Sequence, residues 1–280
     1  MLICKTVAEV RAAVSDLRQA GSVGLVTTMG ALHPGHMALI AAAQADHASV
    51  VATIFVNPTQ FGNPADLDTY PRTEDADLAL LRDAGVAAVF MPDAGVMYPP
   101  GDQTVVETVA LAQSYHGAVR PGHFRGVATV VTKLFNIVGA DAAYFGEKDY
   151  QQLAVIRRMV ADLFIPIAIH GVPTVREDDG LAMSSRNVRL TPGDRAAARV
   201  LHRALRAAED TIHRGGTVQE AVQTIHEIVA DEPRATLTGL DIVNVADFTP
   251  ATGDPTAPIG IMISAQFGDV LLIDQKEIDP

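Results

Sequence analysis

Residues 23–36 read VGLVTTMGALHPGH, and this stretch decides the fold. Residues 23–27 are rich in β-branched side chains, which favour a strand, and a helical pattern follows from Gly35 to about Ala45. Gly30 and Gly35 mark a loop in which the backbone comes close to another group. The stretch therefore predicts a strand, a glycine-containing loop and a helix in succession.

The alternation of strands and helices continues along the chain. Residues 49–56 are nearly all apolar, as expected for a strand buried on both faces. A surface helix that begins with a capping box, Thr6 and Glu9, precedes this pattern. Further strands are predicted at 86–91, 142–145 and 165–170, and further helices at 75–84, 127–138 and from Tyr150. This order predicts a parallel sheet with right-handed crossovers and ligands at the carboxyl ends of its strands.

After about Val175 the pattern changes. Two helical stretches at 192–213 and 218–229 precede strands near 240–245, 259–265 and 270–273. This order is typical of a small α+β domain. We therefore expect an α/β fold with two domains, residues 1–175 and residues 176–280.

The composition narrows the classes of ligand and compartment. Of the 280 residues 48% are hydrophobic and the formal net charge is -12, so we expect small-molecule partners and no nucleic acid. Cys4 is the single cysteine, which excludes an intramolecular disulfide and fits a reducing cytosol. The sequence shows no signal-peptide pattern and no apolar run that approaches a membrane span. We expect a cytoplasmic protein.

The first loop contains two histidines three residues apart. Free N–H groups at the helix N-terminus and the positive end of its dipole favour a phosphate, and His33 and His36 add further donors. Gly35 has no Cβ and lets a flat base approach the backbone. Two alternatives remain: the histidines only cap the helix, or they bind a metal, although no third ligand lies nearby in the sequence.

Two further segments suit a polyphosphate. The loop FGEKDYQQ at 145–152 offers Lys148 as a point charge and Asp149 as an acceptor for ribose hydroxyls or a nucleotide-bound metal. The segment at 175–187 offers the hydroxyls and guanidinium of Ser184-Ser185-Arg186 to a leaving pyrophosphate. Each segment is also compatible with an ordinary polar turn.

Two glutamines suit a small polar acid. Gln60, after the predicted strand at 49–56, and Gln152 could together bind the hydroxyl and carboxylate oxygens of a hydroxy acid. Either glutamine could instead be an exposed loop residue. The basic loop at 120–126 is a candidate lining of the acid pocket or the phosphate path.

Two other features are interpreted as structural. Glu74, Asp75 and Asp77 stand in the first turn of a predicted helix, where acidic residues usually serve the helix dipole rather than a metal. Cys4 has no paired base in the sequence around it, so a nucleophilic role is not expected.

Together these segments resemble the pantoate-β-alanine ligase family, the pantothenate synthetases, within the HxGH nucleotidyltransferase superfamily. The resemblance covers almost the whole chain, and the combination is specific although HxGH alone indicates only the superfamily. The stretches that carry it are 29–36, 55–61, 70–73, 120–127, 145–152 and 179–187. It implies a Rossmann-type N-terminal domain, a smaller C-terminal domain that acts as a lid, and a homodimer.

The resemblance also implies a reaction. Pantoate and ATP, with Mg2+, give pantoyl adenylate and pyrophosphate, and the amine of β-alanine then attacks the acyl carbon to give pantothenate and AMP. Two rival functions stay open. One is a nucleotidyltransferase that couples CTP or ATP to a phosphorylated alcohol, and the other is a nucleotide-binding scaffold without turnover.

The resemblance assigns roles to individual residues. Gln60 and Gln152 are expected to hold pantoate, and His36 is expected to be catalytic. In the mechanism that we expect, further catalytic residues act with His36 by neutralising charge at the α-phosphate, and they are His33, Lys148, Ser184, Ser185 and Arg186. The residues expected to bind ATP are Met29, Gly30, Ala31, Leu32, His33, Pro34, Gly35, His36, Gly146, Glu147, Lys148, Asp149, Val175, Met183, Ser184, Ser185 and Arg186.

One position departs from the family's pattern. Thr27 stands where the family usually has a proline. Because proline fixes φ, we expect its loss to loosen that turn and to have a modest effect on nucleotide affinity.

Overall fold

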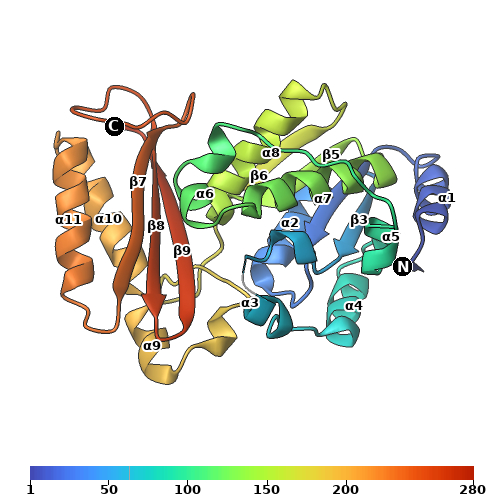
Figure 1. Cartoon of the computed structure of the whole chain (residues 1–280), viewed down its shortest axis with the longest axis horizontal. Helices are drawn as coiled ribbons and strands as arrows, with labels where there is room; N and C mark the ends of the chain where they lie inside the picture. Colours follow the sequence, from blue (N-terminus) through green and yellow to red (C-terminus); the bar gives the residue numbers. More distant parts are fainter. Residues whose placement is uncertain (63) are drawn as a thin grey trace. The chain divides into compact units, whose positions relative to one another are not determined.

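The computed structural model describes residues 1–62 and 64–280. The chain divides into two compact units (Figure 1). The first contains residues 1–146 and 151–173, and the second contains residues 147–150 and 174–280. No helix in the described residues is long and apolar enough to cross a membrane.

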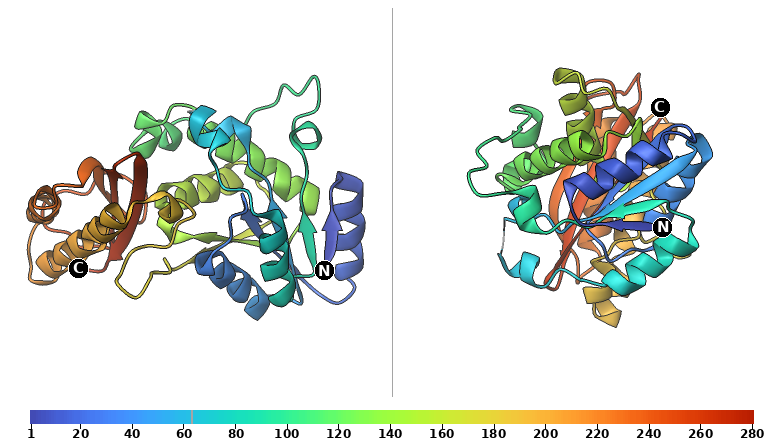
Figure 2. Two further views of the ribbon diagram at one scale, coloured as in Figure 1. Left: turned by 90° about the horizontal axis from the view of Figure 1, so that it is seen from below. Right: turned by 90° about the vertical axis from the view of Figure 1, so that its right-hand side faces the viewer.

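The first unit is a six-stranded parallel sheet with helices on both faces (Figure 2). In the order β1-β4-β3-β2-β5-β6, its strands are β1 (Leu2–Cys4), β4 (Ala88–Phe90), β3 (Ser49–Ile54), β2 (Val23–Thr28), β5 (Ala142–Gly146) and β6 (Ala168–Val172). Its helices are α1 (Val7–Leu17), α2 (Pro34–Asp46), α3 (Pro64–Asp68), α4 (Glu74–Asp83), α5 (Ala94–Met97), α6 (His116–Val119), α7 (His123–Val138) and α8 (Tyr150–Asp162), with 3-10 turns η1 (Pro58–Gln60) and η2 (Leu111–Gln113).

Alternate residues of β2 point into two separate cores. Val23 and Leu25 pack with residues of α1, α7 and α8, whereas Val26 packs with residues of α2 and α4. All three side chains are fully buried. A parallel strand covered on both faces is apolar at nearly every position, which is why the sequence of β2 predicts the sheet.

The second unit is an antiparallel sheet with helices packed against it (Figure 1). Its strands are β7 (Thr236–Asn244), β8 (Ile259–Phe267) and β9 (Val270–Ile278), and its helices are α9 (Pro192–Ala197), α10 (Val200–His213) and α11 (Val218–Ala230), with 3-10 turns η3 (Glu147–Asp149) and η4 (Asn187–Arg189). Gly268 has a φ of 54° in the two-residue turn that joins β8 to β9. The α/β fold class expected from the sequence, with a smaller α+β part, is confirmed.

Several boundaries differ from the sequence prediction. The sequence does not reveal β1, which is three residues long and pairs with β4 at the edge of the sheet. Helix α7 begins at His123 and not at 127, because Gly122 (φ 79°) ends the preceding turn. The predicted helix at 192–213 is divided into α9 and α10, where the Leu201 N–H bonds to the carbonyl of Ala198 in a tighter turn.

Thr27 is not in a turn. It lies within β2, in register with Thr53 of β3. The expectation that the missing proline loosens a turn at this position is therefore wrong, because the turn begins after Thr28.

Candidate active site

The carboxyl ends of β2, β3 and β5 lie at one edge of the parallel sheet. Strand β2 is the middle one, with β3 on one side and β5 on the other. The chain therefore reverses the direction in which it adds strands at β2, and open α/β sheets bind ligands at such a reversal. After β2 the chain carries His33, the N-cap of α2, and His36 in the first turn of that helix, and after β3 it carries Gln60 in η1.

His33 and His36 form a reciprocal cap at the start of α2. The Nδ1 atom of His33 accepts a hydrogen bond from the Gly35 N–H at 3.2 Å. The Nδ1 atom of His36 accepts from the His33 N–H at 3.3 Å, and the two rings lie 4.1 Å apart. The His36 N–H donates to the His33 carbonyl at 2.8 Å. The histidines therefore do cap the helix, and the expectation of free N–H groups at these positions is wrong. Their role toward a phosphate stays a prediction.

These caps fix which nitrogen of each ring carries the proton. A nitrogen that accepts an N–H bond has no proton of its own, so a neutral His33 or His36 carries its proton on Nε2. Each ring then has an Nε2–H donor as well as a capping Nδ1. Capping and anion binding are compatible, because they use opposite nitrogens of the same imidazole.

A buried carboxylate holds the loop that leads to His33. Gly30 and Ala31 are consecutive residues with positive φ, at 81° and 50°. The N–H groups of Ala31 and Leu32 donate to the two carboxylate oxygens of Asp77, at 2.9 and 2.8 Å. Asp77 is only 2% exposed. Asp77 does lie in the first turn of α4, as expected for an acid that favours the helix dipole, but it also has the second role of holding this loop. The sequence does not distinguish Asp77 from the exposed acids beside it.

Gln60 lies in η1, directly after β3. Its Oε1 accepts from the carboxamide of Asn57 at 3.0 Å, and its Nε2 donates to the Met29 sulfur at 3.3 Å. A residue expected to hold pantoate therefore contacts the first residue expected to bind ATP. Asn57 is buried and also donates to the carbonyl of Gly126 at 3.2 Å.

The basic loop at 120–126 supports the same turn. The Nδ1–H of His123 donates to the carbonyl of Gln60 at 2.8 Å. Arg120 donates to Nε2 of the same ring at 3.4 Å. A neutral His123 thus carries its proton on Nδ1, and part of this loop lies beside Gln60.

The two glutamines at the start of α8 differ in their surroundings. Gln151 is buried, and its Nε2 donates to the carbonyls of Leu111 and Ser114 at 2.9 and 2.8 Å. It therefore fixes the segment before α6. Gln152 is half-buried, and its role toward pantoate stays a prediction.

Lys148 lies in η3 and belongs to the second unit. Its Nζ lies 3.8 Å from a carboxylate oxygen of Asp149. The neighbouring Tyr150 donates its hydroxyl to Glu277 on β9 at 2.6 Å. A Cβ on Gly260 would come 2.5 Å from the Tyr150 ring, so the absence of a side chain there lets the ring lie against β8. The lysine-bearing turn is thereby anchored to the C-terminal sheet.

The segment before Ser184 is a tight hairpin within the second unit. The Met183 N–H donates to the carbonyl of Val175 at 3.0 Å, and Gly180 takes a φ of 91° at the turn. Val175 and Met183, both expected to bind ATP, therefore lie side by side. The Ser184 hydroxyl then accepts from the Arg186 N–H at 3.2 Å. The segment therefore forms a turn, and its role toward pyrophosphate stays a prediction.

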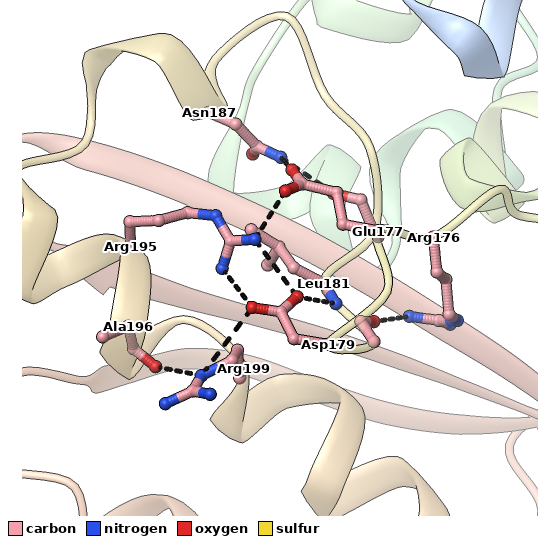
Figure 3. A network of polar contacts seen from close by, with 10 residues as sticks. Arg176, Glu177, Asp179, Leu181, Asn187, Arg195, Ala196 and Arg199 are labelled. Carbon is pink, nitrogen blue, oxygen red and sulfur yellow. Dashed lines mark hydrogen bonds and ion pairs between the residues drawn. The ribbon is translucent and has the colours of Figure 1, made fainter.

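Charged side chains fix this hairpin (Figure 3). Arg195 on α9 pairs with Glu177 at 2.5 Å and with Asp179 at 2.9 Å. Asn187 donates to Glu177 at 3.2 Å. The hydrogen bonds from Arg195 hold the pKa of the Asp179 carboxyl below its usual value. The hairpin and the residues that follow it are therefore joined to α9.

The acidic and sulfur-containing side chains form no evident metal centre in the described ranges. Within residues 1–62 and 64–280, no group of three or more His, Cys, Asp and Glu side chains is placed to hold a metal ion. Cys4 is buried, and burial together with the charge of Glu9 raises the pKa of its thiol. A raised pKa disfavours the nucleophilic thiolate.

The comparison with known families decides the class of the protein. A family model described as pantoate-beta-alanine ligase matches residues 2–277. The chain belongs to this family. The resemblance found in the sequence motifs is thus confirmed, and the protein is a ligase of this family.

The relatives match over nearly their whole length. The pantothenate synthetase of Rhizorhabdus wittichii is 48% identical over 281 residues, which is 100% of this chain and 99% of the relative. That of Sinorhizobium medicae is 50% identical over 98% of this chain and 95% of its own.

Solved structures agree with this relation. A pantothenate synthetase structure from Thermus thermophilus is 47% identical, with a TM-score of 0.95 and 100% of both chains covered. The pantoate-beta-alanine ligase of Francisella tularensis, complexed with beta-gamma ATP and beta-alanine, is 34% identical with a TM-score of 0.82, over 99% of this chain and 97% of that one.

Proposed function

We propose that this protein condenses pantoate with β-alanine at the expense of ATP and releases pantothenate, AMP and pyrophosphate. The family match across residues 2–277 carries the proposal. The complex of the Francisella tularensis relative with beta-gamma ATP and beta-alanine supports it.

The reaction proceeds in two displacements. A carboxylate oxygen of pantoate attacks the α-phosphorus of ATP, and the bond to the bridging oxygen of pyrophosphate breaks. The amine of β-alanine then attacks the acyl carbon of pantoyl adenylate, loses a proton and expels AMP. Neither step needs a covalent enzyme intermediate, so positioning and charge neutralisation supply the rate.

The proposed catalytic group is His36, assisted at the phosphates by His33 through its own Nε2–H. The Nδ1 atoms of both rings accept backbone N–H bonds, and this supports the role because the proton needed for donation is then on Nε2. The side chains proposed to neutralise the remaining phosphate charge are Lys148, Ser184, Ser185 and Arg186.

The remaining proposed ligands of ATP and pantoate follow the family resemblance. Those for ATP are Met29, Gly30, Ala31, Leu32, Pro34, Gly35, Gly146, Glu147, Asp149, Val175 and Met183, and those for pantoate are Gln60 and Gln152. The N–H groups of Ala31 and Leu32 are occupied by Asp77, so these two residues act through the shape of the loop. Gly146 offers backbone without obstruction, since a Cβ there would meet no atom within 4 Å.

ATP is proposed to bind with Mg2+. This ion is commonly held by nucleotide phosphates and one or two carboxylates, and Asp149 beside Lys148 is a suitable carboxylate. The protein is further proposed to be a cytoplasmic homodimer with a Rossmann-type domain, residues 1–175. Residues 176–280 are proposed as a lid that protects the anhydride from water.

Product analysis tests the reaction. The protein is incubated with ATP, Mg2+, pantoate and β-alanine, and AMP is expected only when both organic substrates are present. ADP as the product would refute adenylation. A nucleotidyl product that forms without an amine would favour a nucleotidyltransferase, and no acid-dependent AMP at all would favour a scaffold without turnover.

A substitution tests the role of His36. His36→Ala is expected to reduce pantoate-dependent exchange of labelled pyrophosphate into ATP by about 10²–10³-fold, the usual effect of removing one transition-state donor. His226→Ala, at an exposed position on α11, is the matched control and should keep the exchange. Near-normal exchange in His36→Ala would remove this histidine from the mechanism.

A further inference from the structure

The loop between β2 and His33 is shaped around the buried carboxylate of Asp77. Gly30 and Ala31 both have positive φ, and for Ala31 this backbone conformation is unfavourable by itself. Successive N–H groups in such a turn converge and form a binding site for an anion. The N–H groups of Ala31 and Leu32 converge on the two oxygens of Asp77. The anion of this turn is therefore supplied by the protein and not by a ligand.

The packing around Asp77 is close. A Cβ on Gly30 would come 3.0 Å from one carboxylate oxygen of Asp77. The hydroxyl of Thr73 donates to the same oxygen at 3.1 Å. The two N–H bonds from Ala31 and Leu32 tie α4 to the loop after β2. The Thr73 bond, by contrast, is local to the start of α4.

We propose that Asp77 is a positioning residue for ATP binding. Asp77 holds the loop after β2 so that His33 and His36 form their reciprocal cap at the start of α2. This inference rests on the proposed function for its ligand. A negative charge at this position repels phosphate, so its benefit to ATP binding comes through the backbone that it holds. A substitution that removes the charge of Asp77 but keeps the size of its side chain should therefore weaken ATP binding and not strengthen it.

Asp77→Asn is the direct test, because an amide offers one acceptor and one donor to two N–H groups. Thr73→Val is the matched control, since it removes the third bond to Asp77 and leaves the two loop bonds. ATP affinity measured by calorimetry is expected to fall at least tenfold in Asp77→Asn, while pantoate affinity stays within twofold. Thr73→Val should bind both ligands within twofold of the wild-type protein.

Hydrogen exchange without ligand separates this inference from the proposed function. The amides of Ala31 and Leu32 should exchange at least tenfold faster in Asp77→Asn, and those of the C-terminal half of α4 should be unchanged. If the wild-type protein does not bind ATP, the proposed function fails while the exchange rates still decide the role of Asp77.

Three results would overturn the inference: unchanged amide protection, unchanged or tighter ATP binding, or a parallel loss of pantoate binding and global stability. If Asp77→Asn does not fold, the same measurements on Asp77→Glu decide the matter. Glutamate keeps the charge but moves the oxygens by one methylene, so the losses are expected in the same two amides and in ATP affinity.

Discussion

Gly126 on α7 faces the turn that carries Gln60, and Gly126→Ala tests how closely the two are packed. A Cβ at this position would lie 2.5 Å from the Thr59 carbonyl oxygen and 2.8 Å from the Gln60 Cα. Both obstacles are backbone atoms, so rotation of a side chain cannot relieve the overlap. The turn must move away from α7, and the hydrogen bond from Asn57 to the Gly126 carbonyl lengthens or breaks.

The size of the effect follows from opposing terms. Overpacking costs about 1–3 kcal/mol, and the lost hydrogen bond costs about 1 kcal/mol. Alanine is better than glycine inside a helix by about 1 kcal/mol, which offsets part of this. The free energy of unfolding should therefore fall by about 1–3 kcal/mol, and the melting temperature by roughly 2–4 °C for each kcal/mol.

The assay measures the free energy of unfolding, the KM for pantoate and the affinity for ATP. Because the displaced atoms belong to the turn of Gln60, which is proposed to hold pantoate, the KM for pantoate should rise severalfold while ATP affinity without pantoate stays unchanged. Gly62→Ala is the matched control, since a Cβ there meets no atom within 4 Å and should leave stability and KM unaltered. Wild-type stability and pantoate KM in Gly126→Ala, or an equal loss in Gly62→Ala, would refute the reasoning.

Two further predictions concern the second unit. The pKa of Asp179 is lowered in the folded protein, so its ion pair with Arg195 stabilises the fold at pH values above the ordinary aspartate pKa, about 3.9. This stabilisation is lost as the pH falls through the lower folded-state pKa. Asp179→Asn should therefore lower the melting temperature at pH 7 but not at about pH 2, and equal deficits at both pH values would contradict this. Gly260→Ala should destabilise the protein by about 1–3 kcal/mol, because its Cβ would overlap the Tyr150 ring. Denaturant unfolding should show a much smaller cost in a Tyr150→Leu background, and an equal cost there would exclude Tyr150 as the cause.

The elements that the sequence reveals are those with a strong local pattern. The apolar run of β2 predicts the sheet because both of its faces are covered, and Thr6 with Glu9 predicts the start of α1 because a capping box is complete within four residues. Strand β1 has no such pattern. Its three residues are a strand only because β4 lies beside them.

The candidate site likewise contains residues that the sequence reveals and residues that it does not. The motif at 33–36 identifies the histidines, but their tautomers depend on hydrogen bonds that only the folded loop provides. Asp77 and Asn57 could not be found from the sequence, because their partners are 46 and 69 positions away, at Ala31 and Gly126. A short-range pattern contains no information about such partners.

Residues 147–150 belong to the second unit although the chain on either side of them belongs to the first. A gene fragment that encodes residues 1–173 would include Lys148 and Tyr150 but omit Glu277, which binds the tyrosine hydroxyl, and Gly260, against which the ring lies. A chimera joined at residue 173 would likewise inherit the tyrosine from one parent and its contacts on β8 and β9 from the other. The two units are thus not independent modules for recombination, and divergence at position 150 is constrained by the residues at 260 and 277.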